Sequence, residues 1–184
     1  MIVVVSNLAR AGSSCTMQML SAGGYPCVGK FPSFEVDLDN DRNWIRNCEG
    51  MALKIIDPHH YPPPPGHEYR VIWIDRDIRQ QAKSTMKAQR ALTDLENVHR
   101  SQLRDMERLI REQRRPALDT WAELGAKVLP MRFERIIRSP RESAEDMASF
   151  LRLDLDTKRM AEAVVKRRPS CLPYMLEFRQ LREH

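Results

Sequence analysis

The sequence predicts an α/β protein with three layers, in which helices flank a central parallel sheet on both faces. Short β-branched runs alternate along the chain with segments of helical periodicity, and this alternation is typical of parallel sheets. The first run leads through a short loop directly into a predicted helix, an order that is common in phosphate-binding folds. The length of 184 residues suits one core. We therefore expect a single domain over residues 1–184.

The N-terminal half begins with a β-branched run at residues 2–6, which predicts a buried strand. A helix is expected at residues 13–22, and Gly23 follows it, as glycine often follows a helix C-terminus. The side chains expected on the inner face of this helix are Met17, Leu20 and Ser21. Two more strands are expected at residues 52–56 and 69–75.

The C-terminal half predicts helices at residues 77–91, 94–114, 140–151 and 156–166, and a strand at residues 128–133. The apolar stripe of the second of these helices comprises Val98, Leu103, Met106, Leu109 and Ile110. The inward side chains of the third are expected to be Ala144, Met147, Ala148 and Leu151. A basic tail follows the last helix.

The chain carries a moderate positive charge. Thirty Lys and Arg residues against 25 Asp and Glu give a net charge of +5, which favours anionic ligands without choosing among them. No apolar run approaches the roughly 18 residues of a membrane span, and no basic region precedes the first apolar run, as it would in a signal peptide. The four cysteines have no CxxC or metal-ligand spacing, which indicates thiols in a reducing cytoplasm.

Arginines recur at helical spacing in the segment 94–114, at Arg100, Arg104, Arg108 and Arg111. Acidic residues interleave with them, so a salt-bridged solvent face is the first interpretation. A surface for an anionic acceptor or for nucleic acid is the alternative. Because no RNA- or DNA-binding motif accompanies the stripe, we expect no nucleic-acid partner.

Residues 7–14 form a candidate phosphate-binding loop between the first strand and the first helix. Such P-loops bind anions because the N–H groups of the first helical turn converge on one ligand. Compared with the motif GxxxxGK[ST], Asn7 replaces the first glycine, Gly12 matches the second and Ser13 replaces the lysine. Ser14 matches the hydroxyl position, and Arg10 is a cation within the loop. The alternative is an ordinary turn that Ser13 caps.

Arg76 and Ser84 form a second candidate anion site. Arg76 follows the strand 69–75, and Ser84 lies two turns into the next helix, so a guanidinium and a hydroxyl could converge on one anion. Alternatively, Arg76 pairs with Asp77 at the surface and Ser84 is an ordinary helix hydroxyl. A third interpretation takes Asp75, at the end of an apolar strand, as the magnesium ligand of an ATP-dependent enzyme.

Lys54 lies within the apolar strand 52–56. Burying a lysine costs too much unless an anion compensates its charge, so Lys54 is expected to face a ligand. The alternative is that its ammonium reaches water from a sheet edge. His59 and His60 follow a few residues later and could reach the same cleft, although histidines in a Pro-rich loop are more often exposed.

The loop from Ser6 to Ser14, with the following Met17 to Leu20 and the glycine pair at 23–24, resembles the 5′-phosphosulfate loop of sulfotransferases. These enzymes use 3′-phosphoadenosine 5′-phosphosulfate (PAPS) and release 3′-phosphoadenosine 5′-phosphate (PAP). This sequence departs from the family's loop at Ala9 for the proline, Ala11 for the serine and Ser13 for the threonine. The resemblance implies that Arg10, Ala11, Gly12, Ser13 and Ser14 hold the 5′-phosphosulfate.

Further segments support the same resemblance. The seven-residue gap between Arg76 and Ser84 resembles the family's 3′-phosphate site, and residues 131–140 resemble its strand, acidic turn and Pro-started helix. The tail residues Arg167 and Arg168 are similar to a basic loop that closes over the 3′-phosphate. The alternative for the tail is a solvated charged segment.

The family resemblance also suggests catalytic residues. The segment 52–58 resembles the strand that carries Lys-Thr-His in many soluble members, with Lys54 at the lysine and Ile56 at the position of the catalytic histidine. Isoleucine cannot accept a proton. Other branches use a glutamate after the first helix, which Glu35 matches, while His59 and His60 remain further candidates for the base.

The sequence therefore predicts a sulfotransferase that moves a sulfuryl group from PAPS to a hydroxyl or amine of a small-molecule or glycan acceptor. Lys54 would stabilise charge on the bridging oxygen, and Glu35 or a histidine would take the acceptor proton. This scheme requires no metal ion. Two alternatives of other classes are a phosphotransferase that uses ATP and Mg²⁺, and a nucleotide-binding relative without catalysis.

Overall fold

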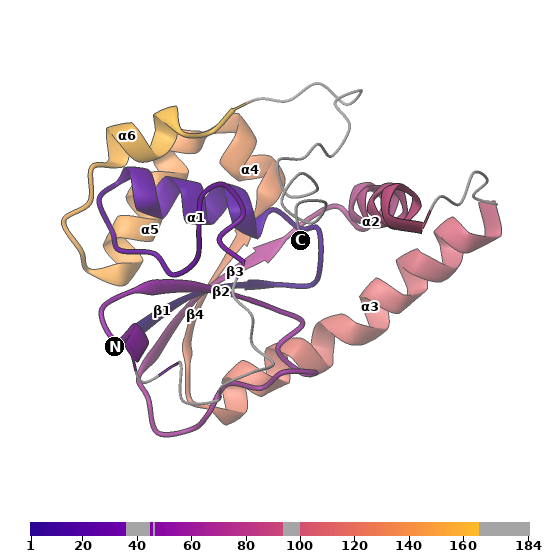
Figure 1. Ribbon diagram of the computed structural model, residues 1–184, viewed down its shortest axis with the longest axis horizontal. Helices are drawn as coiled ribbons and strands as arrows, with labels where there is room; N and C mark the ends of the chain where they lie inside the picture. The colour runs from indigo at the N-terminus through magenta and orange to yellow at the C-terminus, as the bar shows by residue number, and fades with distance from the viewer. Residues whose placement is uncertain (36–44, 46, 94–99, 166–184) are drawn as a thin grey trace.

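The computed structural model describes residues 1–35, 45, 47–93 and 100–165 of the chain (Figure 1). Its elements, in chain order, are β1 (Ile2–Asn7), α1 (Ser13–Ala22), β2 (Ala52–Ile56), β3 (Tyr69–Asp75), α2 (Ile78–Thr93), α3 (Arg100–Glu123), β4 (Lys127–Arg132), α4 (Phe133–Arg138), α5 (Pro140–Leu151) and α6 (Thr157–Glu162). No helix among the described residues is long and apolar enough to cross a bilayer.

The four described strands form one parallel sheet in the order β2-β1-β3-β4. β1 lies in the middle, where Val4 aligns with Leu53 of β2 on one side and with Val71 of β3 on the other. The chain leaves β1 toward β2 and leaves β3 toward β4, so the connections diverge between these two central strands. In open parallel sheets, ligands bind at the carboxyl ends of strands that diverge in this way.

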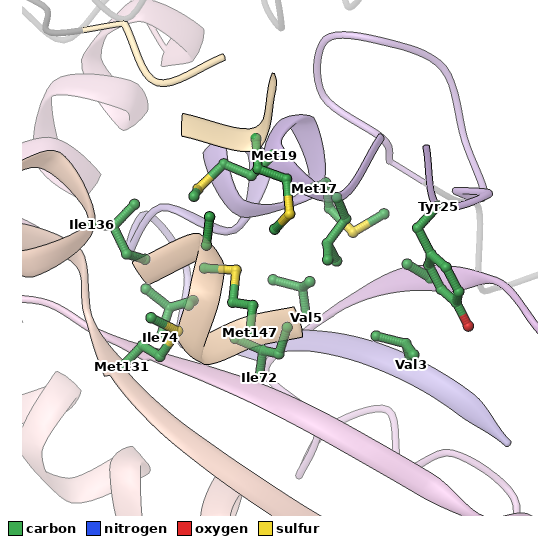
Figure 2. Close-up of a cluster of buried hydrophobic side chains, with 14 of the residues drawn as sticks. Val3, Val5, Met17, Met19, Tyr25, Ile72, Ile74, Met131, Ile136 and Met147 are labelled. Atoms are coloured by element: carbon green, nitrogen blue, oxygen red, sulfur yellow. The ribbon is translucent and has the colours of Figure 1, made fainter. Parts of the chain in front are cut away.

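Side chains alternate along β1 between two cores, because successive residues of a strand point to opposite faces. Val3 and Val5 pack with methionines of α1, α5 and α6, among them Met17 and Met147 (Figure 2). In Figure 1, α1, α5 and α6 gather on this side of the sheet and α3 lies on the other. The expected three-layer α/β fold with a central parallel sheet is therefore confirmed.

The opposite core lies under α2 and α3. Ile2 and Val4 pack there with Trp121, which is fully buried and donates from Nε1 to Ser6 Oγ at 3.1 Å. The apolar faces of α2 and α3 are thus held on the sheet, while the charged face of α3 carries ion pairs. Within α3, for example, Arg108 pairs with Asp105 at 2.9 Å.

Three element predictions need correction. The helix expected to end at residue 114 continues through Pro116 to Glu123, because the burial of Ala117 and Trp121 outweighs the one backbone hydrogen bond that proline removes. The strand expected to reach Phe133 ends one residue earlier, and α4 follows at once. The last helix ends at Glu162 rather than at residue 166.

Two side-chain placements were also wrong. Ser21 is exposed on α1, whose buried residues include Thr16 and Met19 instead. Leu109 is 43% exposed, so the apolar stripe of α3 is narrower than its spacing suggested. Val98 lies outside the described residues.

Candidate functional site

The loop between β1 and α1 lies at the carboxyl edge of the sheet. Arg10 (φ 67°) and Gly12 (φ 117°) adopt the left-handed region, a geometry in which neighbouring backbone N–H groups can form an anion-binding concavity. Helix α1 begins at Ser13, and its cap residue is Gly12, which has no side chain that could bond to the first turn. The prediction that Ser13 caps the turn is therefore wrong, because Ser13 is already the first helical residue. The first N–H groups of a helix have no partner within the helix itself.

Gly12 is required here by space as well as by conformation. A Cβ atom at this position would lie 2.2 Å from Cδ2 of Phe133, the first residue of α4. The backbone of this candidate phosphate loop therefore lies directly against an aromatic ring from a distant part of the sequence. Phe133 was not among the predicted site residues, because no motif spacing connects it to the loop.

Arg76, directly after β3, contacts the loop. Its Nη1 donates to the carbonyl oxygen of Arg10 at 3.1 Å, and its guanidinium lies 4.9 Å from the centre of the Phe133 ring. Burial lowers the pKa of Arg76, and Arg10 lowers it further, whereas Glu134 and Asp77 raise it. An anion beside this half-buried cation would offset its desolvation.

Ser84 lies half-buried in α2, and its hydroxyl makes no hydrogen bond to the described residues. The structure thus brings Arg76 against the candidate phosphate loop, and the Ser84 hydroxyl makes no hydrogen bond to either. Arg167 and Arg168 lie outside the described residues.

An open pocket of about 430 Å³ adjoins Arg76. Its lining residues are Arg76, Gln80, Phe133, Glu134, Ile137 and Arg138. Two guanidinium groups and one aromatic ring suit a ligand that combines negative charge with a flat ring system. Glu134 is anchored at the rim, since its Oε1 accepts a hydrogen bond from the Asp77 amide at 2.8 Å.

Lys54 is buried within β2, with only 1% of its side chain exposed. It aligns with Val5 of β1 and so points to the face that α1 covers. Its Nζ donates to Ser33 O at 2.6 Å, to Ser14 Oγ at 3.2 Å and to the Glu35 carboxylate. The interpretation that Lys54 reaches water from a sheet edge is therefore wrong, and its compensating anion is Glu35.

Glu35 itself is largely exposed, with 59% of its side chain accessible. The structure thus joins three predicted site residues, because Lys54 bonds both to Glu35 and to the hydroxyl of Ser14 in the candidate phosphate loop. Ile56, at the position where the resembling family has a histidine, is half-buried and two residues beyond Lys54 on the same strand face.

His59 and His60 follow β2. Their ring centres lie 4.0 Å apart, and both nitrogens of His59 are buried without a hydrogen-bond partner among the described residues. Burial lowers the pKa of His59, and His60 adds to this effect, while Asp57 opposes it. His60 is exposed. A neutral His59 could accept a proton, but its nitrogens do not face a described donor.

Two residues that the sequence interpretation missed contact the loop directly. Asp57 Oδ1 accepts from the Ala9 amide at 3.3 Å, and the buried Gln81 donates from Nε2 to the carbonyls of Leu8 (3.1 Å) and Ala9 (2.9 Å). In sequence Asp57 is only the residue that follows the predicted strand 52–56. In sequence Gln81 looks like any polar residue on an amphipathic helix, so no signal distinguished it.

Asp75 is occupied by an ion pair. Its two carboxylate oxygens accept from Arg114 of α3, at 2.9 Å from Nε and 2.5 Å from Nη2, and Oδ1 also accepts from Trp73 Nε1 at 3.0 Å. The hydrogen bond from Arg114 to Asp75 raises the pKa of Arg114. A magnesium ion at Asp75 would have to displace this pair. Among the described residues, no group of three His, Cys, Asp or Glu side chains is arranged to hold a metal ion.

Comparison with known proteins gives structural relatives only. No protein-family model matches the chain, and no curated protein matches it in sequence. The sulfotransferase domain from the curacin biosynthetic pathway superposes with a TM-score of 0.60 at 11% identity, over 90% of this chain and 78% of that one. A sulfotransferase from Alicyclobacillus acidocaldarius gives 0.59 at 14% identity, over 91% and 86%.

A third structure, mouse sulfotransferase SULT7A1 complexed with PAP, gives a TM-score of 0.56 at 13% identity, over 88% of this chain and 62% of that one. The three proteins share this chain's fold at low sequence identity. The chain therefore has a sulfotransferase-like fold, as its loop and strand motifs predicted.

Proposed function

We propose that the protein is a sulfotransferase that uses PAPS as donor and transfers the sulfuryl group to a hydroxyl or amine of a small-molecule or glycan acceptor. The observation that carries this proposal is the contact between Arg76 and the carbonyl of Arg10. It brings the cation after β3 against the phosphate loop after β1, at the point where the sheet connections diverge. The fold shared with sulfotransferases, one of them complexed with PAP, supports the same function.

The residues around the loop fit a nucleotide that carries two anionic groups. Backbone N–H groups of residues 10–14, at the start of α1, would hold the 5′-phosphosulfate. Arg76, with Ser84 on the next helix, would hold the 3′-phosphate. The pocket beside Arg76 offers the Phe133 ring for a flat base and Arg138 as a second cation. Arg167 and Arg168 remain candidates for the 3′-phosphate.

Lys54 and Glu35 are the proposed catalytic pair. When bound, PAPS supplies a sulfuryl group on a good leaving group. The Lys54 ammonium lies 3.2 Å from Ser14 Oγ, next to the proposed phosphosulfate loop, where a fixed positive charge stabilises the negative charge that develops during transfer. Glu35, bonded to Lys54 and open to solvent, would accept the acceptor's proton. His59 and His60 are the alternative bases.

Two other functions are weighed against this proposal. A phosphotransferase that uses ATP and Mg²⁺ is disfavoured, because Arg114 occupies both oxygens of Asp75. A nucleotide-binding relative without catalysis is favoured by Ile56, which cannot accept a proton. A cytoplasmic location, expected from the cysteine spacing, stays a prediction.

Thermal unfolding with added nucleotides tests the proposed function. PAP should raise the melting temperature without a metal ion, because a ligand at 100 times its Kd stabilises the folded state by about 2.7 kcal/mol. ATP with Mg²⁺ is the comparison, and adenosine without phosphates is the control. A larger shift from ATP that depends on Mg²⁺ would overturn the proposal and favour the phosphotransferase. Tight PAP binding without sulfation of any acceptor would favour the relative without catalysis.

A further inference from the structure

The phosphate loop is held from outside by side chains that its resemblance to sulfotransferase loops does not assign. Asp57 follows β2, Gln81 lies in α2, and neither takes part in the proposed nucleotide contacts. Both bond to backbone atoms of the loop, and they approach it from different elements of the fold.

Gln81 fixes two consecutive carbonyl groups. It is 3% exposed, and its Nε2 lies 3.1 Å from Leu8 O and 2.9 Å from Ala9 O. Asn7 also donates to Leu8 O, at 2.8 Å. Because the buried Gln81 amide donates to both loop carbonyls, it determines how the peptide planes that contain these carbonyls are rotated.

The direction of the following N–H groups depends on these bonds. In a planar trans peptide, the carbonyl and the next N–H point in opposite directions. When Gln81 draws the Ala9 carbonyl toward α2, the Arg10 N–H must point away from α2. Arg76 acts in the same way on the next peptide, since its bond to the Arg10 carbonyl turns the Ala11 N–H to the opposite side.

Asp57 completes the arrangement on the first peptide. The Leu8 carbonyl points to Gln81, and the N–H of the same peptide, that of Ala9, points to Asp57 Oδ1 at 3.3 Å. Asp57 is itself fixed, because its amide donates to Asn7 O at 3.0 Å and its backbone is left-handed, with φ 51°. The N–H group of Ala9 needs such an acceptor. A proline at this position would have no N–H group to donate.

We infer that Gln81 and Asp57 are positioning residues that hold the phosphate loop in its anion-binding conformation by fixing the peptide planes of Leu8 and Ala9. This inference rests on the proposed function, in which the loop binds the 5′-phosphosulfate. It adds a requirement that reaches beyond the loop motif, because one residue after β2 and one within α2 set the aim of the loop donors.

The test compares ligands that use the loop with a ligand that does not. Inorganic pyrophosphate and PAP both place an anionic group on the loop, whereas adenosine 3′-monophosphate has no 5′-phosphate. Gln81→Met, which keeps the size but removes the donors, should raise the Kd for pyrophosphate and PAP by about tenfold or more, while the Kd for adenosine 3′-monophosphate stays within about twofold. Isothermal titration calorimetry on the full chain measures all three.

Matched variants separate positioning from stability. Thr85→Val removes a hydrogen bond to the Gln81 carbonyl within α2 (3.1 Å) without touching the loop, and it should leave all three affinities unchanged. Asp57→Ala should weaken pyrophosphate and PAP as Gln81→Met does. Asp57→Asn keeps an acceptor oxygen for the Ala9 N–H and should restore binding.

Each other result has a defined meaning. Unchanged pyrophosphate binding in Gln81→Met, or equal losses for all three ligands, overturns the inference. If the wild-type protein binds PAP no more tightly than pyrophosphate, the proposed function is overturned. The affinities of the variants for pyrophosphate then decide the inference alone. Wild-type protein that binds neither ligand overturns both.

Discussion

Two cations of the site differ in how much of their hydrogen-bonding capacity the fold has already used. Lys54 has three donors and three acceptors around it, one of them the Glu35 carboxylate. Arg76 has five N–H groups and, among the described residues, donates one hydrogen bond, to Arg10 O. Arg76 is thus the better equipped of the two to bind a ligand, and Lys54 the better fixed to act electrostatically on one.

The first prediction at the residue scale concerns Arg76. Replacing Arg76 by Ala should weaken PAP more than adenosine 5′-phosphosulfate, because the latter has no 3′-phosphate and loses only the hold that Arg76 has on the loop. A hydrogen bond to a charged group is worth about 1.5–3 kcal/mol, or roughly 10- to 150-fold in Kd. Calorimetric titration measures both ligands, with the exposed Arg79→Ala on α2 as control. Equal losses for both ligands would show that Arg76 acts on the loop alone and does not bind the 3′-phosphate.

The second prediction concerns the base. Glu35→Gln should keep PAP affinity and lower turnover by about 10²–10⁴-fold, the usual effect of a lost general base. Turnover is measured with PAPS and a panel of simple phenols, sugars and amines. The double variant His59→Ala/His60→Ala is the comparison. If the histidine variant loses turnover and Glu35→Gln does not, the base is a histidine, although the enzyme class is unchanged.

At the scale of elements, the site depends on the contact between the phosphate loop and α4. Gly12 lies against the Phe133 ring, and Arg76 lies over the same ring. α4 has only six residues, so its position relies on packing. Its residue Ile136 is fully buried against the core. The ring thus links the loop after β1, the cation after β3 and the helix after β4.

This contact gives the third prediction. Gly12→Ala should lower the free energy of unfolding by about 2–5 kcal/mol, because it adds strain at positive φ to a clash with Phe133. Gly66→Ala is the matched control: its φ of 92° is equally unfavourable, but no atom lies within 4 Å of the added Cβ, so only the strain of about 1–3 kcal/mol applies. Chemical denaturation measures both.

A double variant checks the cause. In a Phe133→Ala background, Gly12→Ala should lower the free energy of unfolding by less than it does in the wild type, because the clash with the ring is then absent. If Gly12→Ala and Gly66→Ala lose the same amount, the ring does not press on the loop.

The accuracy of the sequence predictions follows from where their signals lie. The bounds 13–22, 52–56, 69–75 and 140–151 match the structure because glycine, proline and acidic turn residues punctuate them locally. α4 was not foreseen, since six residues are too few to show helical periodicity. The extent of α3 depends on tertiary burial around Trp121, which no local pattern contains.

The candidate site divides in the same way. Arg10, Lys54 and Arg76 stand out in sequence because they are charges next to or within apolar strands. Gln81 and Asp57 do not, because their role comes from bonds to a loop 72 or 73 and 48 residues away. Such contacts require the fold itself.

At the scale of the whole molecule, the sheet separates two cores that share its strands. One contains Met147 and Ile136 beneath α1, α4, α5 and α6, and the other contains Trp121 and Ile110 beneath α2 and α3. Each strand presents alternate residues to both cores, so neither layer has a complete sheet of its own. If the chain is a single domain, as expected, the two layers should therefore unfold cooperatively.

The fourth prediction is that both layers unfold in one transition. Ile136→Val and Ile110→Val truncate opposite cores and should each cost about 0.5–1.5 kcal/mol, with the double variant losing the sum to within about 0.5 kcal/mol. The chain has three tryptophans, and Trp44→Phe leaves Trp73 and Trp121, which belong to the α2–α3 core. In this background, tryptophan fluorescence during urea unfolding reports on that core. Ile136→Val lies in the other core, yet it should shift this fluorescence midpoint as far as it shifts the midpoint from far-ultraviolet circular dichroism. If Ile136→Val leaves the fluorescence midpoint unchanged, the layers unfold separately and the chain does not behave as a single domain.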